Sequence, residues 1–183
     1  MRYRVGTRGS KLALAQTKQV IEKLKSAFPE DEFDVVIIKT TGDMDQKSRL
    51  DQIGSKGTFV KEIEGELLEE KIHLAVHSMK DMPDTTADGL IFAKAWKRED
   101  PRDVLVLPEG VAELDFSKPV GCSSRRRMLQ FQAMYPEATF APIRGNVYTR
   151  LAKVDSGEYA ATILAAAGLK RLGLEQRISR YFS

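Results

Sequence analysis

Hydrophobic positions in this chain follow two spacings, one typical of strands and the other typical of helices. In the first half, short apolar or β-branched runs predict strands at residues 3–7, 35–38, 74–76 and 90–95. Apolar residues at helical spacing predict one helix that begins after Ser10 and ends at Pro29, and another over residues 59–68. The continuous β-branched run at 35–38 favours a buried parallel strand.

Two stretches interrupt this alternation. Residues 42–57 hold three glycines and show no apolar periodicity, which predicts a long mobile loop. Residues 97–103 place six charges around Pro101. We expect residues 99–103 to form a hinge, because charge density and proline both disfavour a core.

The pattern restarts beyond the predicted hinge. An apolar run covers residues 104–107, strands are predicted at 139–141 and 162–166, and helices at 124–135 and 149–155. Strands that alternate with helices indicate βαβ units with mainly parallel sheets. We therefore expect an α/β fold of two domains, residues 1–98 and 104–183, that meet at a cleft.

Composition narrows the class of protein. The 183 residues are 42% hydrophobic and 30% charged, with a net charge of +3, as in an ordinary globular protein. No apolar run approaches the roughly 18 residues that cross a bilayer, so we expect no membrane association. Cys122 is the lone cysteine, which excludes an intrachain disulfide, and the first residues lack an apolar signal segment. These features predict a cytoplasmic protein.

The charge is unevenly distributed. Between Lys118 and Lys153 seven basic residues and one acidic residue give a net charge of +6, so the rest of the chain carries −3. Five of the seven are arginines, which bind carboxylate or phosphate through paired N–H groups. The block predicts a localised anion site, and the alternative is a solvated basic face.

Ligands of open α/β sheets bind beyond the carboxyl ends of strands, which directs attention to the polar residues there. Lys80 and Asp81 follow one predicted strand; Lys80 could hold an anion, and Asp81 could stabilise a cation or relay a proton. The alternative is an inert surface pair. His73 and His77 lie along a strand, too far apart for one metal ion, so no metal site is predicted. Cys122 is interpreted as a small, partly buried residue.

Seven motifs occur in a characteristic order, at residues 8–16 (RGSKLALAQ), 41–43 (TGD), 56–62 (KGTFVKE), 77–83 (HSMKDMP), 98–103 (REDPRD), 144–147 (RGNV) and 164–174 (LAAAGLKRLGL). Together they resemble the porphobilinogen deaminase (hydroxymethylbilane synthase) family. The resemblance implies domains with the fold of type II periplasmic binding proteins. It also implies a transferase of haem biosynthesis that joins four porphobilinogen molecules head to tail with release of ammonia. The growing chain would be attached to a dipyrromethane cofactor. We also expect the protein to be a monomer that acts on a small-molecule substrate.

The resemblance also assigns roles to individual residues. Asp81 matches the catalytic carboxylate, which stabilises the azafulvene cation formed when ammonia leaves. Lys56 lies in the part of the chain that matches a mobile lid. The residues that match positions for binding cofactor or substrate are Arg8, Ser10, Lys56, Lys80, Ser123, Ser124, Arg126, Arg127, Arg144, Asn146 and Arg150.

The sequence departs from the family pattern at its cofactor site. In the family, a third, α+β domain at the C-terminal end carries the cysteine that binds dipyrromethane through a thioether. We expect that domain to be absent from these 183 residues, and Cys122 lies where threonine is usual in the family. We therefore predict that the 183-residue chain cannot anchor the cofactor covalently and is inactive alone.

Two other functions are compatible with parts of the pattern. A two-lobed, non-enzymatic binding module for a polycarboxylate would explain the arginines but gives residues 77–81 no purpose. Nucleic-acid binding through residues 125–150 would need interleaved aromatic residues for base stacking, and the block has only scattered ones. We therefore expect no nucleic-acid partner.

Overall fold

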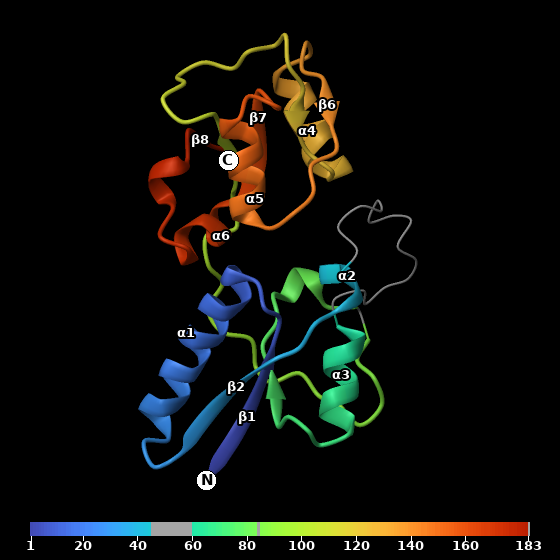
Figure 1. The fold of residues 1–183 in the computed structure, drawn as a ribbon, viewed down its shortest axis with the longest axis vertical. Helices are drawn as coiled ribbons and strands as arrows, with labels where there is room; N and C mark the ends of the chain where they lie inside the picture. The colour runs from blue at the N-terminus through green and yellow to red at the C-terminus, as the bar shows by residue number, and fades with distance from the viewer. Residues whose placement is uncertain (45–59, 84, 183) are drawn as a thin grey trace. The chain divides into compact units, whose positions relative to one another are not determined.

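The computed structural model describes residues 1–44, 60–83 and 85–182, and it confirms an α/β fold (Figure 1). The chain divides into two compact units, Met1–Trp96 (unit 1) and Lys97–Ser183 (unit 2). Among the described residues, no helix is both long enough and apolar enough to cross a membrane.

Unit 1 is built on a parallel sheet of three strands in the order β2-β1-β3. Its strands are β1 (Arg2–Thr7), β2 (Glu32–Ile37) and β3 (Leu74–Ala75). Its helices are α1 (Lys11–Ala27), α2 (Thr41–Met44), α3 (Lys61–Leu68) and the short 3-10 helix η1 (Met79–Asp81). Helix α1 packs on β1 and β2, whereas α3 packs on β1 and β3. The core includes Val5, Val60, Ile63 and Ile72.

Unit 2 is built on a sheet of five strands in the order β6-β5-β7-β4-β8. Its strands are β4 (Asp103–Val106), β5 (Val120–Gly121), β6 (Phe140–Ala141), β7 (Ala161–Ala165) and β8 (Arg180–Tyr181). Its helices are α4 (Arg125–Met134), α5 (Val147–Asp155), α6 (Ala166–Arg171) and the 3-10 helix η2 (Glu175–Arg177). Strand β4 pairs antiparallel with β7 and β8, so it runs opposite to the other four strands.

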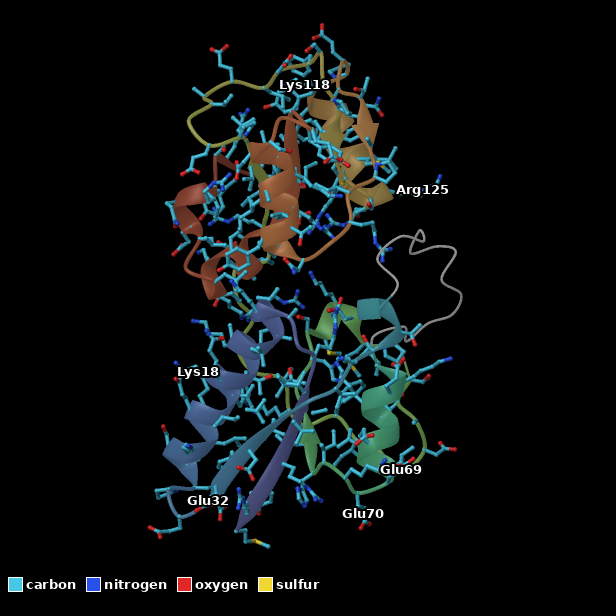
Figure 2. All side chains as sticks on the ribbon, viewed as in Figure 1. Lys18, Glu32, Glu69, Glu70, Lys118 and Arg125 are labelled. Atoms are coloured by element: carbon cyan, nitrogen blue, oxygen red, sulfur yellow. The ribbon has the colours of Figure 1, made fainter. Side chains whose placement is uncertain are left out.

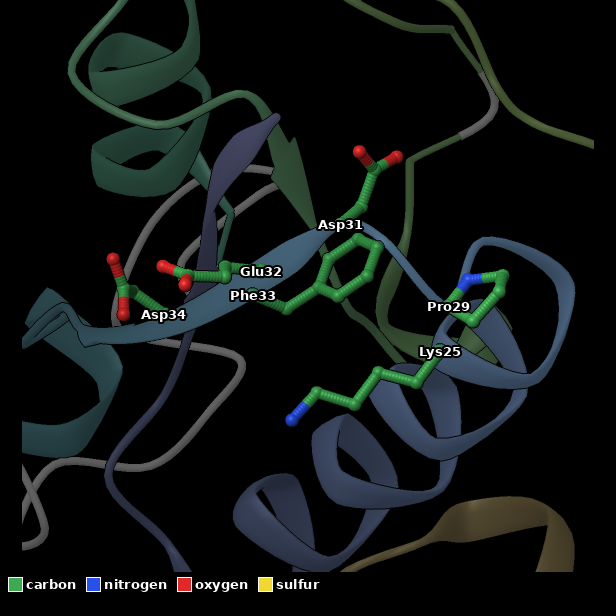
Figure 3. Close-up of a pocket in the computed structure, with 6 residues that line it drawn as sticks. All are labelled: Lys25, Pro29, Asp31, Glu32, Phe33 and Asp34. Atoms are coloured by element: carbon green, nitrogen blue, oxygen red, sulfur yellow. The ribbon is translucent and has the colours of Figure 1, made fainter.

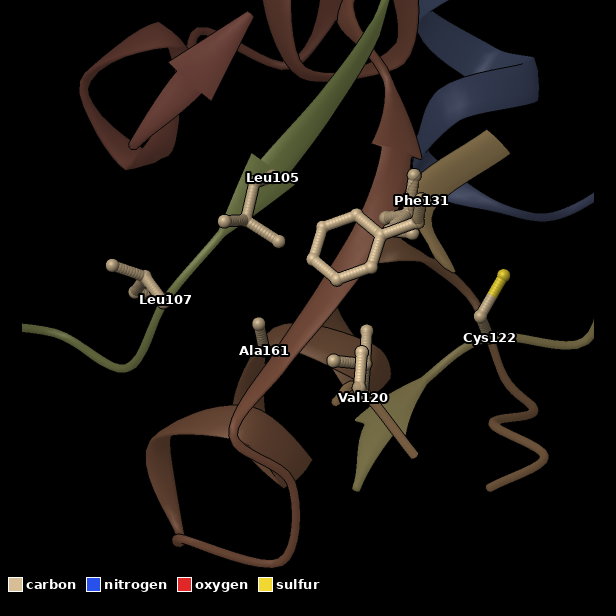
Figure 4. Packing of buried hydrophobic residues seen from close by; sticks show 8 residues of the cluster. Leu105, Leu107, Val120, Cys122, Phe131 and Ala161 are labelled. Atoms are coloured by element: carbon tan, nitrogen blue, oxygen red, sulfur yellow. The ribbon is translucent and has the colours of Figure 1, made fainter. Parts of the chain in front are cut away.

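The core of unit 2 surrounds the ring of Phe131, which α4 places against the sheet (Figure 4). Leu105, Val120 and Ala161 contribute side chains from three different strands to this cluster. Charged side chains such as Lys118 and Arg125 lie on the outside of the unit (Figure 2). Burial of the apolar face therefore fixes the strands, whose ends carry the polar residues of interest.

The environment predicted for the β-branched run at 35–38 is wrong. The run does form a strand parallel to β1, with Val35 opposite Val5. However, β2 is an edge strand, and Val35 and Ile37 are 46% and 56% exposed. Composition indicates a strand but does not reveal whether a neighbour covers it.

Two further predictions need correction. Thr41–Met44 forms a helical turn where residues 42–57 were expected to be a loop, and residues 45–59 lie outside the described part of the chain. Residues 90–95 form no strand, and Ile91 is almost fully exposed. The expected hinge at residues 99–103 stays a prediction; its last residue, Asp103, is the first residue of β4, and Asp100 and Asp103 are 9% and 14% exposed in ion pairs.

Candidate functional site

In unit 1, the predicted site residues gather at the carboxyl ends of two neighbouring strands. Strands β1 and β3 are parallel, with Gly6 opposite Ala75, so the segments that follow them emerge at the same edge of the sheet. Arg8 and Ser10 follow β1. Lys80 and Asp81 follow β3 in the 3-10 turn η1, where the Asp81 N–H donates to the Ser78 carbonyl at 2.9 Å.

The pKa of His77 indicates which charged groups lie near it at this edge of the sheet. Burial is the main cause that lowers the pKa of His77; the negative charge of Asp81 opposes this shift, and the positive charge of Arg8 adds to it. Arg8 and Asp81 therefore both lie within electrostatic reach of the imidazole. From the sequence, His77 was considered as a metal ligand and rejected, and its place between these charges was not predicted.

Hydrogen bonds hold the surrounding loops in place. The Ser10 hydroxyl accepts from the Ala13 N–H at 3.2 Å and so caps α1, the helix that was expected to begin after Ser10. The side chains of Gln16 and Ser78 are joined at 2.9 Å, which links α1 to the segment before η1. Lys80 is exposed on η1, and Lys56 lies outside the described residues.

The remaining histidine has a structural partner. The Arg4 N–H donates to Nδ1 of His73 at 2.9 Å, and the imidazole stands edge-on to Tyr3. No cluster of potential metal ligands occurs among residues 1–44, 60–83 and 85–182.

In unit 2, the carboxyl ends of β5, β6 and β7 meet at one edge because these strands are parallel neighbours. The loop after β5 leads to Arg126 and Arg127 in the first turn of α4, and the loop after β6 leads to Arg144 and Arg150. Because β4 runs in the opposite direction, its first residue, Asp103, lies at this edge opposite Ala165.

Asp103 joins two of the predicted ligand-binding arginines. Its Oδ1 accepts from Nε and an Nη of Arg127 at 3.0 and 2.8 Å, and its Oδ2 accepts from an Nη of Arg126 at 2.8 Å. Burial acts to raise the pKa of Asp103, but the hydrogen bonds and charges of the two arginines outweigh it and hold the pKa below its usual value. The expected hinge motif contained this residue, yet nothing in its spacing indicated the contact.

Arg144 and Arg150 extend the positive charge. Arg150 Nε donates to the Gly145 carbonyl at 2.9 Å. Burial lowers the pKa of Arg150, and the charges of Arg127 and Arg144 lower it further. Four arginines therefore lie around this edge, and the charges of Arg127 and Arg144 both act on Arg150. An arrangement of this kind is suited to ligands with several carboxylates.

Three predicted binding residues have hydroxyl or amide groups that stabilise the loops. The Ser123 hydroxyl donates to the Ile143 carbonyl at 3.0 Å and accepts from the Ile143 N–H at 3.1 Å. Ser124 caps α4, and Asn146 caps α5. These residues hold the arginine-bearing loops in place, and direct contact with a ligand stays a prediction.

Cys122 lies at the end of the core cluster beside Val120 (Figure 4). The residue is 4% exposed, and its Sγ lies 3.7 Å from the Ser124 carbonyl oxygen. Burial raises the pKa of the thiol, against the effect of the nearby arginines. A neutral, enclosed thiol is a weak nucleophile.

A surface pocket of about 420 Å³ lies elsewhere in unit 1, between the end of α1 and the start of β2 (Figure 3). Its lining residues are Lys25, Pro29, Asp31, Glu32, Phe33 and Asp34. None of these is a predicted site residue. The pocket lies at the amino end of β2, whereas the predicted residues follow the carboxyl ends of β1 and β3.

Comparison with solved structures identifies the fold class of this chain. Over the whole chain, the structure resembles the probable amino-acid ABC transporter extracellular-binding protein ytmK from Bacillus subtilis, with a TM-score of 0.51, 13% identity and 78% coverage of that chain. The class is therefore an α/β protein with the fold of periplasmic binding proteins.

The family follows from sequence comparison. The model of "Porphobilinogen deaminase, dipyromethane cofactor binding domain" matches residues 3–183. Porphobilinogen deaminases from Acetivibrio thermocellus and Clostridioides difficile are 55% and 51% identical over 183 and 180 residues, which cover 100% and 97% of this chain. The chain belongs to the porphobilinogen deaminase family. It spans 63% and 60% of the length of these two relatives.

Proposed function

We propose that this chain contributes the catalytic and carboxylate-binding residues of a hydroxymethylbilane synthase, which condenses four porphobilinogen molecules head to tail with release of ammonia. The observation that carries the proposal is the set of four arginines around the carboxyl ends of β5 and β6. Each porphobilinogen has an acetate and a propionate, so a growing chain of pyrroles needs many cationic partners. Arg126, Arg127, Arg144 and Arg150 supply them, and family membership supports the substrate.

Asp81 is the catalytic residue of the proposal. When the C–N bond of porphobilinogen breaks and ammonia leaves, positive charge develops on the remaining methylene-pyrrole unit. A carboxylate close to the pyrrole stabilises that charge. The position of Asp81 after β3, within reach of His77 and with Arg8 also nearby, supports this role, because a polar loop can present the carboxylate to a ligand. Ser10 and Lys80 complete this set in unit 1.

The cofactor in this proposal is dipyrromethane, which when bound supplies the first two pyrroles to which substrate is added. Its carboxylates match the arginines of unit 2 in charge and in hydrogen-bond donors. Its covalent attachment does not match Cys122, whose thiol is enclosed beside Val120. We therefore propose that these 183 residues alone bind the pyrrole carboxylates without forming a thioether and do not catalyse the condensation of porphobilinogen.

The first experiment tests attachment. The purified 183-residue chain is incubated with porphobilinogen and analysed by intact mass before and after denaturation. We expect the mass of the unmodified chain and no sustained release of ammonia. A stable adduct with the mass of two pyrrole units would overturn the proposal that this chain cannot anchor the cofactor.

The second experiment tests catalysis. The chain is joined to the remaining part of the Acetivibrio thermocellus relative, and ammonia release is measured for this extended protein and for its Asp81→Asn variant. We expect release by the former and a loss of at least about a hundredfold in the latter. The matched control is Asp88→Asn, an exposed acid on the segment after η1. Binding of porphobilinogen without any ammonia release would favour a non-enzymatic binding module instead.

A further inference from the structure

Asp103 forms ion pairs with both Arg126 and Arg127 at the start of α4. Asp103 is 14% exposed and Arg127 is 16% exposed, so their ion pair is largely shielded from water. Arg127 also donates from its other Nη to the Ile163 carbonyl at 3.2 Å. Its guanidinium is thus fixed on two sides, which makes the Asp103 carboxylate a well-defined anchor.

Arg126 is held by the same carboxylate in a more open position. Its guanidinium is 61% exposed and also donates to Oε1 of Gln130 at 2.8 Å. A guanidinium carries five N–H donors, of which Asp103 and Gln130 take two here. The ion pair therefore orients Arg126 while N–H groups stay available for a ligand.

The fold brings this negative charge from outside the basic block. Between Lys118 and Lys153 the sequence holds one acid, Glu137, against seven basic residues. The antiparallel direction of β4 places Asp103 at the edge where the parallel strands end. Asp103 thus supplies a negative charge to Arg126 and Arg127, the two arginines that begin α4.

We propose that Asp103 is a positioning residue that holds the guanidinium groups of Arg126 and Arg127 in the orientation in which they receive ligand carboxylates. The proposal rests on the proposed function, because it takes the ligand to be the carboxylates of porphobilinogen. Asp103 itself does not contact the ligand.

A positioning role for Asp103 and a purely electrostatic role predict opposite effects of Asp103→Asn on ligand affinity. Asp103→Asn removes a negative charge beside an anion site, so electrostatic attraction alone would make an anionic ligand bind more tightly. If Asp103 positions the arginines, the same substitution weakens binding because both guanidinium groups lose their common anchor. The sign of the change therefore decides between the two roles.

The matched control is Asp100→Asn. Asp100 is also a largely buried acid of unit 2, and it pairs with Arg102 at 2.7 Å and Lys170 at 3.0 Å, neither of which belongs to the four arginines. Both variants change the net charge by the same amount, and both remove an acid that pairs with two cations. They differ in which cations they release.

The experiment uses the 183-residue chain and two measurements. NMR of the Arg127 and Arg102 Nε–H groups reports whether these two guanidinium groups are held, and calorimetric titration with porphobilinogen reports affinity. In Asp103→Asn we expect faster hydrogen exchange at Arg127 Nε–H and roughly tenfold weaker binding. In Asp100→Asn we expect the change at Arg102 Nε–H instead, where the native distance to Asp100 is 2.9 Å, with affinity retained. Asp103→Glu, which keeps the charge, replaces Asp103→Asn if the latter does not fold.

Each outcome decides the proposal. An unchanged Arg127 Nε–H signal in Asp103→Asn, or tighter binding of porphobilinogen, would overturn it. If the native chain binds no porphobilinogen, the ligand named in the proposed function is wrong. The Arg127 Nε–H signal would still show whether Asp103 holds that guanidinium.

Discussion

The side chain of Asn146 binds Thr149 twice: its Oδ1 accepts from the Thr149 N–H at 3.0 Å and from the Thr149 hydroxyl at 3.2 Å. This pair begins α5 and fixes the turn that carries two of the four arginines. Gly145, just before it, has a φ of +108°, and a Cβ there would lie 2.7 Å from Thr149 Cβ. The Arg150 guanidinium donates to the Gly145 carbonyl, so its position depends on the same turn.

Gly145→Ala is therefore expected to destabilise unit 2. The left-handed conformation alone costs an alanine about 1–2 kcal/mol, and the close approach to Thr149 adds to that cost. Urea unfolding measures the change. Gly110→Ala is the matched control, because Gly110 has a φ of +78° but open space around its Cβ. Equal losses of stability in the two variants would show that the contact with Thr149 contributes nothing.

Local sequence signals were sufficient for much of the fold. Ser10 and Ser124 cap α1 and α4, whose starts were predicted after Ser10 and at Ser124, because a hydroxyl at the N-cap accepts from a backbone N–H of the first turn. Helix α6 was missed, since the run that precedes it is apolar and merges with β7. Local composition could not separate the two elements.

The site was predictable only in part, because its contacts join distant residues. Family motifs named Arg126 and Arg127, but their partner Asp103 lies 23 and 24 residues away. The contact depends on the antiparallel direction of β4, which no periodicity reveals. Similarly, His77 received no role from sequence, because its charged neighbours become visible only when the ends of β1 and β3 are placed side by side.

The pKa of His77 provides a direct test of the edge in unit 1. Asp81 acts to raise this pKa and Arg8 to lower it, on top of the larger lowering by burial. We expect Asp81→Asn to lower the pKa further and Arg8→Leu to raise it. An NMR titration of the imidazole measures both shifts, with His73 as the internal control. Identical titration of His77 in all three proteins would contradict the proximity of these residues.

Replacing Arg126 with leucine is expected to weaken porphobilinogen binding by more than the loss of one surface charge explains. A charge-assisted hydrogen bond contributes roughly 1.5–3 kcal/mol, equivalent to about 12–160-fold in affinity. Arg144→Leu should behave similarly.

Arg125→Leu is the control for both substitutions. Arg125 is an exposed neighbour in the same helical turn, and we expect its loss to change affinity by no more than about threefold (Figure 2). Calorimetric titration of the three variants gives the comparison. Equal effects in all three would show that the block acts only through its overall charge.

The ion pairs of Asp103 predict how the stability of unit 2 depends on pH. The pKa of Asp103 lies below its usual value of 3.8 because the arginines outweigh the effect of burial. The unfolded chain therefore binds a proton at a higher pH than the folded chain does. The contribution of Asp103 to stability is fully present above the usual pKa and is lost as pH falls through the folded pKa.

We expect Asp103→Asn to lower the free energy of unfolding at about pH 6, and the difference from the native chain to shrink as pH approaches about 3. Urea unfolding at a series of pH values measures this difference. Glu113→Gln, at an exposed acid in the same unit, should leave the pH dependence unchanged. A difference that stays constant between these pH values would mean that packing around Asp103, rather than its charge, stabilises the start of β4.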